Sequence, residues 1–429
     1  MKIKLPTPNK VRELQRKLYL KSKAERKFRF YSLYDKVCRL DILKEAWKQV
    51  RENKGACGVD YETIGMIETN GVESFLKQLQ KELIRKTYKP QAVKRVWIPK
   101  ADGSKRPLGI PTVKDRLVQT AVKIVIEPIF EANFQNCSYG FRPKRSTHQA
   151  VKEVKKFLDW GLVNVVDADI SDFFNNISHK RLLELIAQRI VDKQILRLIK
   201  QWLKCGVLEE GKIRKQITGT PQGGVISPLL ANIYLNVLDS NWQRKNYSVR
   251  NGLDAHLIRY ADDLLILTSK SAAVPQRLLE GELKQLGLEL NSKKTRIISA
   301  EETTFDFLGF SFRKRLKLEK MKRVAFCFPS AKAQKVIRAK IREITRNKPV
   351  KVSEVVEKLN PVVRGWVNYF RIGNSGRIFL KIRDYTEMKV RGFIRHRQVK
   401  NGYGWKEITS DFLYGKLGLY YNWRVVYDW

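Results

Sequence analysis

Two apolar segments of this chain end in aspartates, and this pattern constrains its fold more than any other feature. Residues 162–166 are typical of a buried strand, which leads into Asp167-Ala168-Asp169. Residues 257–260 and 264–268 are typical of two strands joined by a tight turn at Ala261-Asp262-Asp263. If these strands are neighbours in one sheet, the carboxylates of the two segments lie together.

Converging carboxylates suit a reaction run by divalent cations. Two such ions about 4 Å apart can hold the attacking and leaving oxygens of a nucleotidyl transfer in line. Mg²⁺ prefers oxygen ligands and keeps several waters, so two or three carboxylates suffice. Asp169, Asp262 and Asp263 are therefore the candidate catalytic residues and ligands of two Mg²⁺ ions, with Mn²⁺ as a possible substitute. An isolated Asp-Asp pair is more often only a polar hairpin turn, so the rest of the chain decides between these interpretations.

The charge of the chain indicates an anionic partner. Lys and Arg number 85 against 43 Asp and Glu, a formal net charge of +42. A compact chain with this excess repels itself unless nucleic acid or an anionic membrane neutralises it. No segment approaches the roughly 20 apolar residues that span a bilayer, which favours nucleic acid and no membrane contact. Residues 1–29 lack the apolar core of a secretory signal, although a transit peptide remains an alternative.

The cysteines and histidines exclude two further classes of protein. The five cysteines are scattered and form no Cys-x-x-Cys pair, and the four histidines are scattered as well. This pattern supports neither a disulfide scaffold nor a zinc site. We expect a reducing, cytoplasmic location, with nucleic acid as the binding partner.

Local patterns predict a mixed α/β module followed by helices. Helices are expected at residues 10–27, 41–53, 72–86 and 114–130, and again from 330 to 397. A basic β-hairpin is expected from strands at 92–99 and 106–110 around a turn at 101–104.

The Tyr260-Ala-Asp-Asp263 turn resembles the signature of reverse transcriptases, and its neighbours resemble the bacterial group II intron-encoded reverse transcriptase/maturase family. The resemblance covers nearly the whole chain, in the family's order. The other segments that carry it are KGACGVD at 54–60, RVWIPK through RPLGIP at 95–111, SYGFRP at 138–143, DADISDFF at 167–174, TPQGG at 220–224, LNSKKT at 290–295 and FLGF at 307–310.

This resemblance implies a right-hand polymerase, with fingers and palm, followed by an all-helical thumb/maturase (X) domain. The implied domains are a basic N-terminal extension at 1–40, fingers at 41–163, palm at 164–312 and thumb/maturase at 313–429. The implied activity is RNA-directed DNA polymerisation together with maturase action in splicing. The implied partners are group II intron RNA, an RNA template with a DNA or RNA primer, and deoxynucleoside triphosphates (dNTPs).

The resemblance also assigns residues to the substrate. Asp169, Asp262 and Asp263 are implied as the metal ligands. Asp167 is expected deeper in the sheet. Asp172 stands where relatives often have a basic residue, and we expect its side chain to point to solvent or nucleic acid, outside the site. The implied dNTP-binding residues are Lys100 and Arg106 on the triphosphate, Phe174 against the sugar 2′ position, Gln222 at the nascent base pair and Lys294 at the leaving pyrophosphate. Phe173 is expected in the core.

Cations in the C-terminal third predict RNA contacts. Between residues 311 and 400 there are 26 Lys and Arg against 6 Asp and Glu, with aromatic residues interleaved. Such a concentrated excess exceeds what solubility requires, and cations on exposed helix faces would bind RNA phosphates. The predicted nucleic-acid-binding residues of the whole chain are Lys54, Arg142, Arg364, Arg391 and Arg395.

Two other functions remain open. The chain could be a non-catalytic RNA-binding splicing factor with a relic polymerase fold, although the intact Asp169, Asp262 and Asp263 argue against this. It could also be a domesticated reverse transcriptase in host defence, which only the genomic context separates from an intron-encoded protein.

Overall fold

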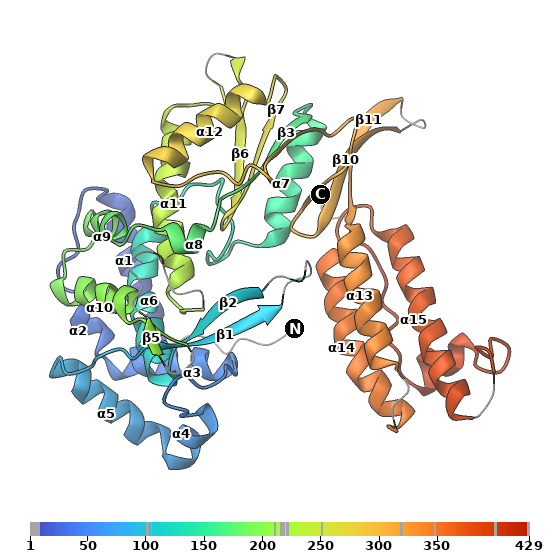
Figure 1. Ribbon diagram of the computed structural model, residues 1–429, viewed down its shortest axis with the longest axis horizontal. Coiled ribbons are helices and arrows are strands. Elements are labelled where there is room, and N and C mark those ends of the chain that lie inside the picture. The colour runs from blue at the N-terminus through green and yellow to red at the C-terminus, as the bar shows by residue number, and fades with distance from the viewer. Residues whose placement is uncertain are drawn as a thin grey trace.

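The computed structural model describes residues 9–99, 103, 105–209, 212–214, 219, 223–249, 252–317, 321–346, 349–398 and 401–426. In these ranges helices and strands are mixed up to residue 329, and helices follow from there (Figure 1). The predicted α/β module with a helical C-terminal part is confirmed. None of the helices in these ranges is both long enough and apolar enough to cross a membrane.

The N-terminal part of the chain is a group of helices around α6. It contains α1 (Asn9–Ala24), α2 (Tyr34–Val37), α3 (Leu40–Glu52), α4 (Ile64–Asn70), α5 (Val72–Ile84) and α6 (Val113–Glu131). Thr112 caps α6, since its hydroxyl accepts a hydrogen bond from the Asp115 amide at 3.0 Å. Contacts with α1, α2 and α3 bury α6 on nearly every side, as expected for a helix that is largely apolar all round. All four helices predicted in this region are confirmed.

A small sheet carries the predicted basic hairpin. Its strands are β1 (Val93–Pro99), β2 (Lys105–Ile110), β4 (Val207–Glu209) and β5 (Lys212–Arg214), in the order β2-β1-β4-β5. The hairpin of β1 and β2 is antiparallel and pairs Ile98 with Arg106. The pairing with β4 and β5 was not predicted, because strands of three residues are too short to show alternation.

The central sheet has the order β6-β7-β3-β8. Its strands are β3 (Asn164–Asp169), β6 (His256–Tyr260), β7 (Asp263–Thr268) and β8 (Arg296–Ser299), and the helices around it are α7 (Thr147–Asp159), α11 (Ser227–Arg244) and α12 (Ala273–Gln285) (Figure 1). Side chains alternate between two cores, since Val165 packs in the core that contains α7 residues and Val166 in the one that contains α11 residues. The sheet therefore fixes the register of β3 and β7 firmly, because a slip of one residue would exchange the two faces.

Short helices connect β3 with β4: α8 (Phe173–Asn176), α9 (His179–Ala187) and α10 (Lys193–Lys204). Asp192 caps α10, accepting from the Gln194 amide at 2.9 Å. Its second oxygen accepts from the amides of Leu33 and Tyr34, both at 2.8 Å. This carboxylate therefore joins the start of α10 to the N-terminal helices.

The C-terminal helices share a core with the central sheet. They are α13 (Ala331–Ile344), α14 (Val352–Phe370) and α15 (Gly376–Arg397), followed by a π-helix (Phe412–Lys416). A three-stranded sheet of β9 (Phe305–Phe307), β10 (Phe310–Lys317) and β11 (Lys322–Pro329) precedes them. One apolar cluster extends from α7 and β3 through Phe310 and Phe312 to α14 and α15. The predicted boundary between residues 312 and 313 thus falls inside β10, a strand that was not predicted.

Candidate active site

The predicted metal ligands lie at one end of the central sheet. β6 and β7 form a hairpin, and its turn contains Ala261 in the left-handed region at φ 59° and Asp262. β7 pairs antiparallel with β3, in a register that places Asp169 opposite Asp263. Residues opposite each other in such a pair have Cβ atoms about 5 Å apart. The strand pairing therefore brings carboxylates together from segments that are far apart in the sequence.

The electrostatics of these carboxylates reflect their crowding. Burial raises the pKa of Asp263 to about 6, and the like charges of Asp262 and Asp169 act in the same direction. Burial also raises the pKa of Asp262, and the guanidinium of Arg106 partly offsets this effect. Lys294 likewise opposes the rise at Asp263. The cluster thus has an excess of negative charge that a cation would relieve.

The donor set fits a hard divalent cation. Carboxylate oxygens are the ligands that Mg²⁺ prefers, and their mutual repulsion favours a bound cation. Lys294 already donates to Asp169, with Nζ 3.1 Å from Oδ2. Within the described ranges no three His, Cys, Asp or Glu side chains are arranged closely enough to hold a metal ion by themselves. Binding would therefore need small side-chain rotations and water ligands.

Replacing Asp263 with asparagine is expected to raise the melting temperature of the protein in EDTA by roughly 1–3 °C, because it removes one of the repelling charges. Added Mg²⁺ should stabilise the wild type, since it binds only the folded chain, and should stabilise the variant less. Thermal unfolding with and without Mg²⁺ measures both effects. A variant less stable than the wild type in EDTA would contradict the crowding of these carboxylates.

Two further aspartates of the segment 167–172 have hydrogen-bond partners of their own. Asp167 accepts from Arg296 at 3.2 Å; burial raises its pKa and this arginine lowers it. Asp172 is exposed in a left-handed conformation at φ 42° and accepts hydrogen bonds from the Asn175 amide group at 2.8 and 3.0 Å. The charge of Asp167 still acts on Asp263 and contributes to its raised pKa, after burial and the charges of Asp262 and Asp169.

Phe173 and Phe174 differ in burial, as expected. Phe173 is buried in the core, whereas Phe174 is half-buried at the edge of that core. Gly219 packs on this segment, since a Cβ there would lie 2.7 Å from the Phe174 carbonyl oxygen. Gly223 packs on β2, where a Cβ would lie 2.4 Å from the Gly109 carbonyl oxygen. Gly219 therefore lies against the Phe174 segment and Gly223 against the basic hairpin.

The predicted dNTP-binding cations are placed as follows. Arg106 is exposed on β2, and its charge acts on Asp262, so the hairpin faces the carboxylates. Lys294 is exposed and contacts Asp169. The predictions for Lys100 and Gln222 fall outside the described residues.

The structure gives Arg142 an internal role in place of the predicted contact with nucleic acid. Its side chain is only 3% exposed and pairs with Glu131 at 2.7 Å. It also donates to the carbonyls of Gln135 and Ser138, at 2.5 and 2.7 Å. These partners use its donors inside the fold.

The same correction applies to Arg391, whose side chain is 2% exposed. It pairs with Glu387 at 2.8 Å, donates to the Ile408 carbonyl at 2.8 Å and lies over the Trp405 ring at 4.2 Å. Arg395 is tied to the same segment, through Glu407 at 2.6 Å and the Asn401 carbonyl at 2.8 Å. Both arginines therefore fasten residues 401–414 to α15.

Lys54 and Arg364 are exposed, as a contact with RNA phosphates requires. Lys54 lies at φ 46° at the start of the 54–60 loop, which packs on α6 through a hydrogen bond from Arg116 to the Ala56 carbonyl at 2.6 Å. Arg364 lies on α14 with its guanidinium 5.8 Å from the centre of the Tyr420 ring.

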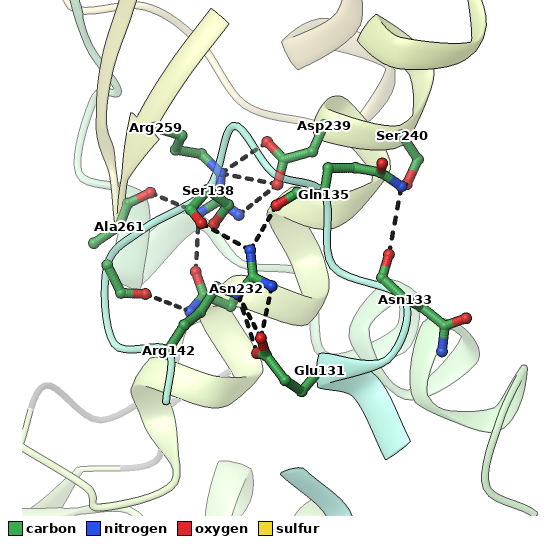
Figure 2. A network of polar contacts seen from close by, with 11 residues as sticks. Glu131, Asn133, Gln135, Ser138, Arg142, Asn232, Asp239, Ser240, Arg259 and Ala261 are labelled. Atoms are coloured by element: carbon green, nitrogen blue, oxygen red, sulfur yellow. Dashed lines mark hydrogen bonds and ion pairs between the residues drawn. The ribbon is translucent and has the colours of Figure 1, made fainter. Parts of the chain in front are cut away.

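A buried polar network behind the turn was missed by sequence reasoning. Arg259 of β6 pairs with Asp239 of α11 and bonds Asn232 and the Ala261 carbonyl (Figure 2). The signal was present in the sequence, since Arg259 is the one charged residue in the strand 256–260 that carries the turn. A charge in a buried strand requires a partner, but the partner's identity depends on tertiary structure.

Two protein families match the chain. Residues 98–312 match the reverse transcriptase (RNA-dependent DNA polymerase) family, and residues 334–410 match the group II intron maturase-specific domain. The first match contains Asp169 and the turn with Asp262 and Asp263. The second runs from α13 to the segment before the π-helix.

Relatives over long stretches of the chain agree with these matches. Protein YkfC of Escherichia coli (strain K12) is 35% identical over 364 residues, 76% of this chain and 94% of that protein. The group II intron-encoded protein LtrA of Lactococcus lactis subsp. cremoris is 42% identical over 214 residues, 49% of this chain and 35% of LtrA. A 91 kDa protein in the cob intron of Schizosaccharomyces pombe is 26% identical over 411 residues, 79% of this chain and 50% of that protein.

The chain thus covers nearly all of one relative and at most half of the other two. A reverse transcriptase domain followed by a maturase-specific domain, in a chain similar to an intron-encoded protein, is the organisation that the sequence motifs predicted. The chain therefore belongs to the group II intron-encoded reverse transcriptase/maturase family, and its first matched domain is an RNA-directed DNA polymerase.

Proposed function

We propose that this chain copies RNA into DNA by adding deoxynucleotides to a primer 3′-hydroxyl at Asp169, Asp262 and Asp263, which hold two divalent cations. The observation that carries this proposal is the strand register that sets Asp169 opposite Asp263 beside the turn. A polar turn alone would need no third carboxylate on a second strand.

The chemistry divides between the cations and the side chains. When bound, two divalent cations supply the charge that activates the primer hydroxyl and stabilises the leaving oxygen. The aspartates would hold and orient them from the end of the sheet at which β3 and β7 pair. Lys294, 3.1 Å from Asp169, is close enough to donate a hydrogen bond or a proton to the departing pyrophosphate.

The incoming dNTP would lie between the basic hairpin and Phe174. Arg106 and Lys100 would bind the triphosphate, Arg as a bidentate fork and Lys as a point charge. Gln222 would contact the nascent base pair. The described glycines nearest to it in the sequence are Gly219, which packs on the Phe174 segment, and Gly223, which packs on β2. The ring of Phe174 would exclude a sugar 2′-hydroxyl by steric contact.

Replacing Phe174 with alanine is expected to lower discrimination against ribonucleotides by about 10–100-fold, because one steric contact in a pocket contributes that much to specificity. Single-nucleotide incorporation of dNTP and rNTP measures the ratio of the two kcat/KM values. Phe173→Leu, in the core behind it, is the matched control and should change stability more than sugar choice. Unaltered discrimination in Phe174→Ala would remove this residue from the site.

The right-hand description follows from the same placement. The N-terminal helices with the basic hairpin would act as fingers, the central sheet as palm and α13–α15 as thumb and maturase (X) domain. The shared core of the sheet and α13–α15 supports a thumb that is firmly joined to the palm. Because that core includes β10, we place the start of the last domain after the β10–β11 hairpin instead of at residue 313.

Exposed cations on α13 support an RNA-binding role for the C-terminal domain. Ile337 and Ile341 face the core. The exposed cations of this helix and the residues after it are Lys332, Lys335, Lys340, Arg342 and Arg346. Such a surface would bind the phosphates of a template–primer duplex and of the parent group II intron with strong salt dependence. Arg364 on α14 and Lys54 in the N-terminal loop would extend the contact.

Primer extension tests the polymerase proposal directly. The full-length protein, an RNA template annealed to a DNA primer, dNTPs and Mg²⁺ should give extended DNA that the Asp262→Ala/Asp263→Ala variant does not make. Absence of extension by the wild type, in Mg²⁺ and in Mn²⁺, would leave the splicing-factor function instead.

The maturase proposal needs a separate experiment. The intron that flanks the gene should splice at a lower Mg²⁺ concentration when the protein is present, because bound cationic side chains replace part of the ionic requirement. The aspartate double variant should keep this effect, since splicing help does not use the polymerase site. No change with protein in excess at low salt would confine the C-terminal helices to the template–primer duplex.

A further inference from the structure

Arg259 is a fully buried cation next to the catalytic turn. Its side chain and that of Asp239 are both 0% exposed. Its Nε and Nη2 atoms donate to both oxygens of Asp239, at 2.5 to 3.1 Å. Burial of such a pair is costly, and apolar residues of similar volume are often as stable or more so. Stability alone therefore gives no reason for an ion pair at this position.

The remaining donor of Arg259 reaches the turn itself. Its Nη1 atom donates to the Ala261 carbonyl oxygen at 2.9 Å and to the Asn232 side-chain oxygen at 2.9 Å (Figure 2). Ala261 is held at φ 59°, a conformation that residues with a Cβ adopt rarely. Because this carbonyl belongs to the peptide bond that leads into Asp262, the guanidinium fixes the orientation of that peptide.

A second segment supports the turn from behind. Arg259 exchanges backbone hydrogen bonds with it, accepting from the Tyr139 amide at 2.9 Å and donating to the Cys137 carbonyl at 2.8 Å. The Asn232 amide group donates to the Gly140 carbonyl at 2.8 Å. A Cβ on Gly140 would lie only 2.4 Å from the Ala261 nitrogen, so the two backbones are in direct contact. Arg142, paired with Glu131, holds the other end of this loop in place (Figure 2).

The turn needs such support because its charges repel. The strand register sets Asp263 opposite Asp169, and Asp262 precedes Asp263 in the turn, so three carboxylates are held close to one another. A hairpin end free to relax would move the carboxylates apart before a cation arrives. A cation would then have to pull them together, and its affinity would fall accordingly.

We propose that Arg259 is a positioning residue for the polymerase site. Clamped by Asp239 and Asn232, it holds the Ala261 carbonyl, so that Asp262 and Asp263 face Asp169 before the cations bind. This inference rests on the proposed function, because it concerns the same carboxylates. The proposal also explains the position of the 138–143 segment, because its backbone contacts Arg259 and Ala261 and so supports the turn.

The test is the full-length Arg259→Met/Asp239→Leu variant, which removes both charges together and leaves no buried charge alone. It should fold and keep its KM for dNTPs within about threefold of the wild type. Its kcat should fall by about 100-fold, since displaced catalytic groups cost that much. Mn²⁺ binding, followed by electron paramagnetic resonance, should weaken by about tenfold as pre-organisation is lost. Amide hydrogen exchange of residues 256–268 in EDTA should become faster.

Two more variants separate positioning from stability. Gly140→Ala keeps the ion pair but pushes a methyl group against Ala261, so it should reproduce the weaker Mn²⁺ binding and faster exchange. This variant carries the test if the double variant does not fold. Arg259→Lys keeps the charge but has fewer hydrogen-bond donors. Its Mn²⁺ affinity and amide exchange rates should lie between those of the wild type and the double variant. Arg391→Met is the control, because Arg391 is also a buried arginine but lies far along the chain in α15. This variant should be less stable than the wild type and should keep the wild-type Mn²⁺ affinity.

Wild-type Mn²⁺ affinity and wild-type exchange in both the double variant and Gly140→Ala would overturn the proposal, whatever their melting temperatures. A wild type that extends no primer would defeat the proposed function instead. The Mn²⁺ and exchange measurements would still decide whether Arg259 positions the turn.

Discussion

Primer extension by the Asp262→Asn variant is expected to fall by about 1,000-fold or more. Charge stabilisation by bound cations contributes several kcal/mol to the barrier, and each 1.4 kcal/mol corresponds to a factor of ten. The substitution keeps the shape of the side chain and the turn but removes one anionic ligand. Single-turnover addition of one dNTP to a primer on an RNA template measures the effect on the chemical step.

Asp172→Asn is the matched control for this prediction. It removes the same charge three residues after Asp169, yet the Asp172 carboxylate is exposed and accepts hydrogen bonds from the Asn175 amide group. Its rate should stay within about threefold of the wild type, as for a surface substitution. Equal losses in both variants would mean that net charge, and not a metal site at the turn, accounts for the effect. Equal activity in all three proteins would place the catalytic carboxylates elsewhere.

The arrangement of the aspartates could be predicted because it depends on local patterns. The apolar runs before Asp169 and on either side of Asp262 identify strands, and one tight turn joins two of them. Only the pairing of β3 with β7 had to be assumed. The alternating cores on the two faces of the sheet then exclude a slip of one residue, and in the observed register Asp169 lies opposite Asp263.

The positions of the internal arginines could not be predicted, because burial is a tertiary property. Arg142 and Arg391 lie in basic stretches that look like exposed RNA-binding surface, and each has its carboxylate partner inside the fold. Strand β10 could not be predicted from the sequence for a related reason. Its Phe310 and Phe312 face the core, but the following Arg, Lys and Arg residues gave it the composition of a solvated segment.

These corrections change the interpretation of the charge itself. The formal excess of +42 does not mean that every cation faces RNA. Arg142, Arg259 and Arg391 are each buried with a carboxylate, and each bonds segments that are separate in the sequence. In a chain rich in Arg, buried arginines thus join parts of the fold, and we expect only the exposed arginines to contact phosphates.

Replacing Arg391 with methionine is therefore expected to reduce the free energy of unfolding by about 3 kcal/mol, because the buried Glu387 keeps only the more distant Arg383, 3.7 Å away, as a cationic partner. The loss should appear in the C-terminal domain, since Arg391 also holds the Ile408 carbonyl and stacks on Trp405. Chemical denaturation followed by tryptophan fluorescence measures it. At temperatures where the variant is folded, its RNA affinity should depend on salt as in the wild type.

Arg364→Met is the matched control, because Arg364 is an exposed arginine of α14 in the same domain. It should leave stability nearly unchanged, within about 0.5 kcal/mol. It should instead lower the slope of log affinity against log salt by about 1, as expected when one phosphate contact is lost. If Arg391→Met reduced that slope without destabilising the domain, the internal ion pair would be incorrect and the guanidinium would face RNA. Opposite signatures from two arginines of one domain would show that burial, and not the density of positive charge, determines which cations bind the intron.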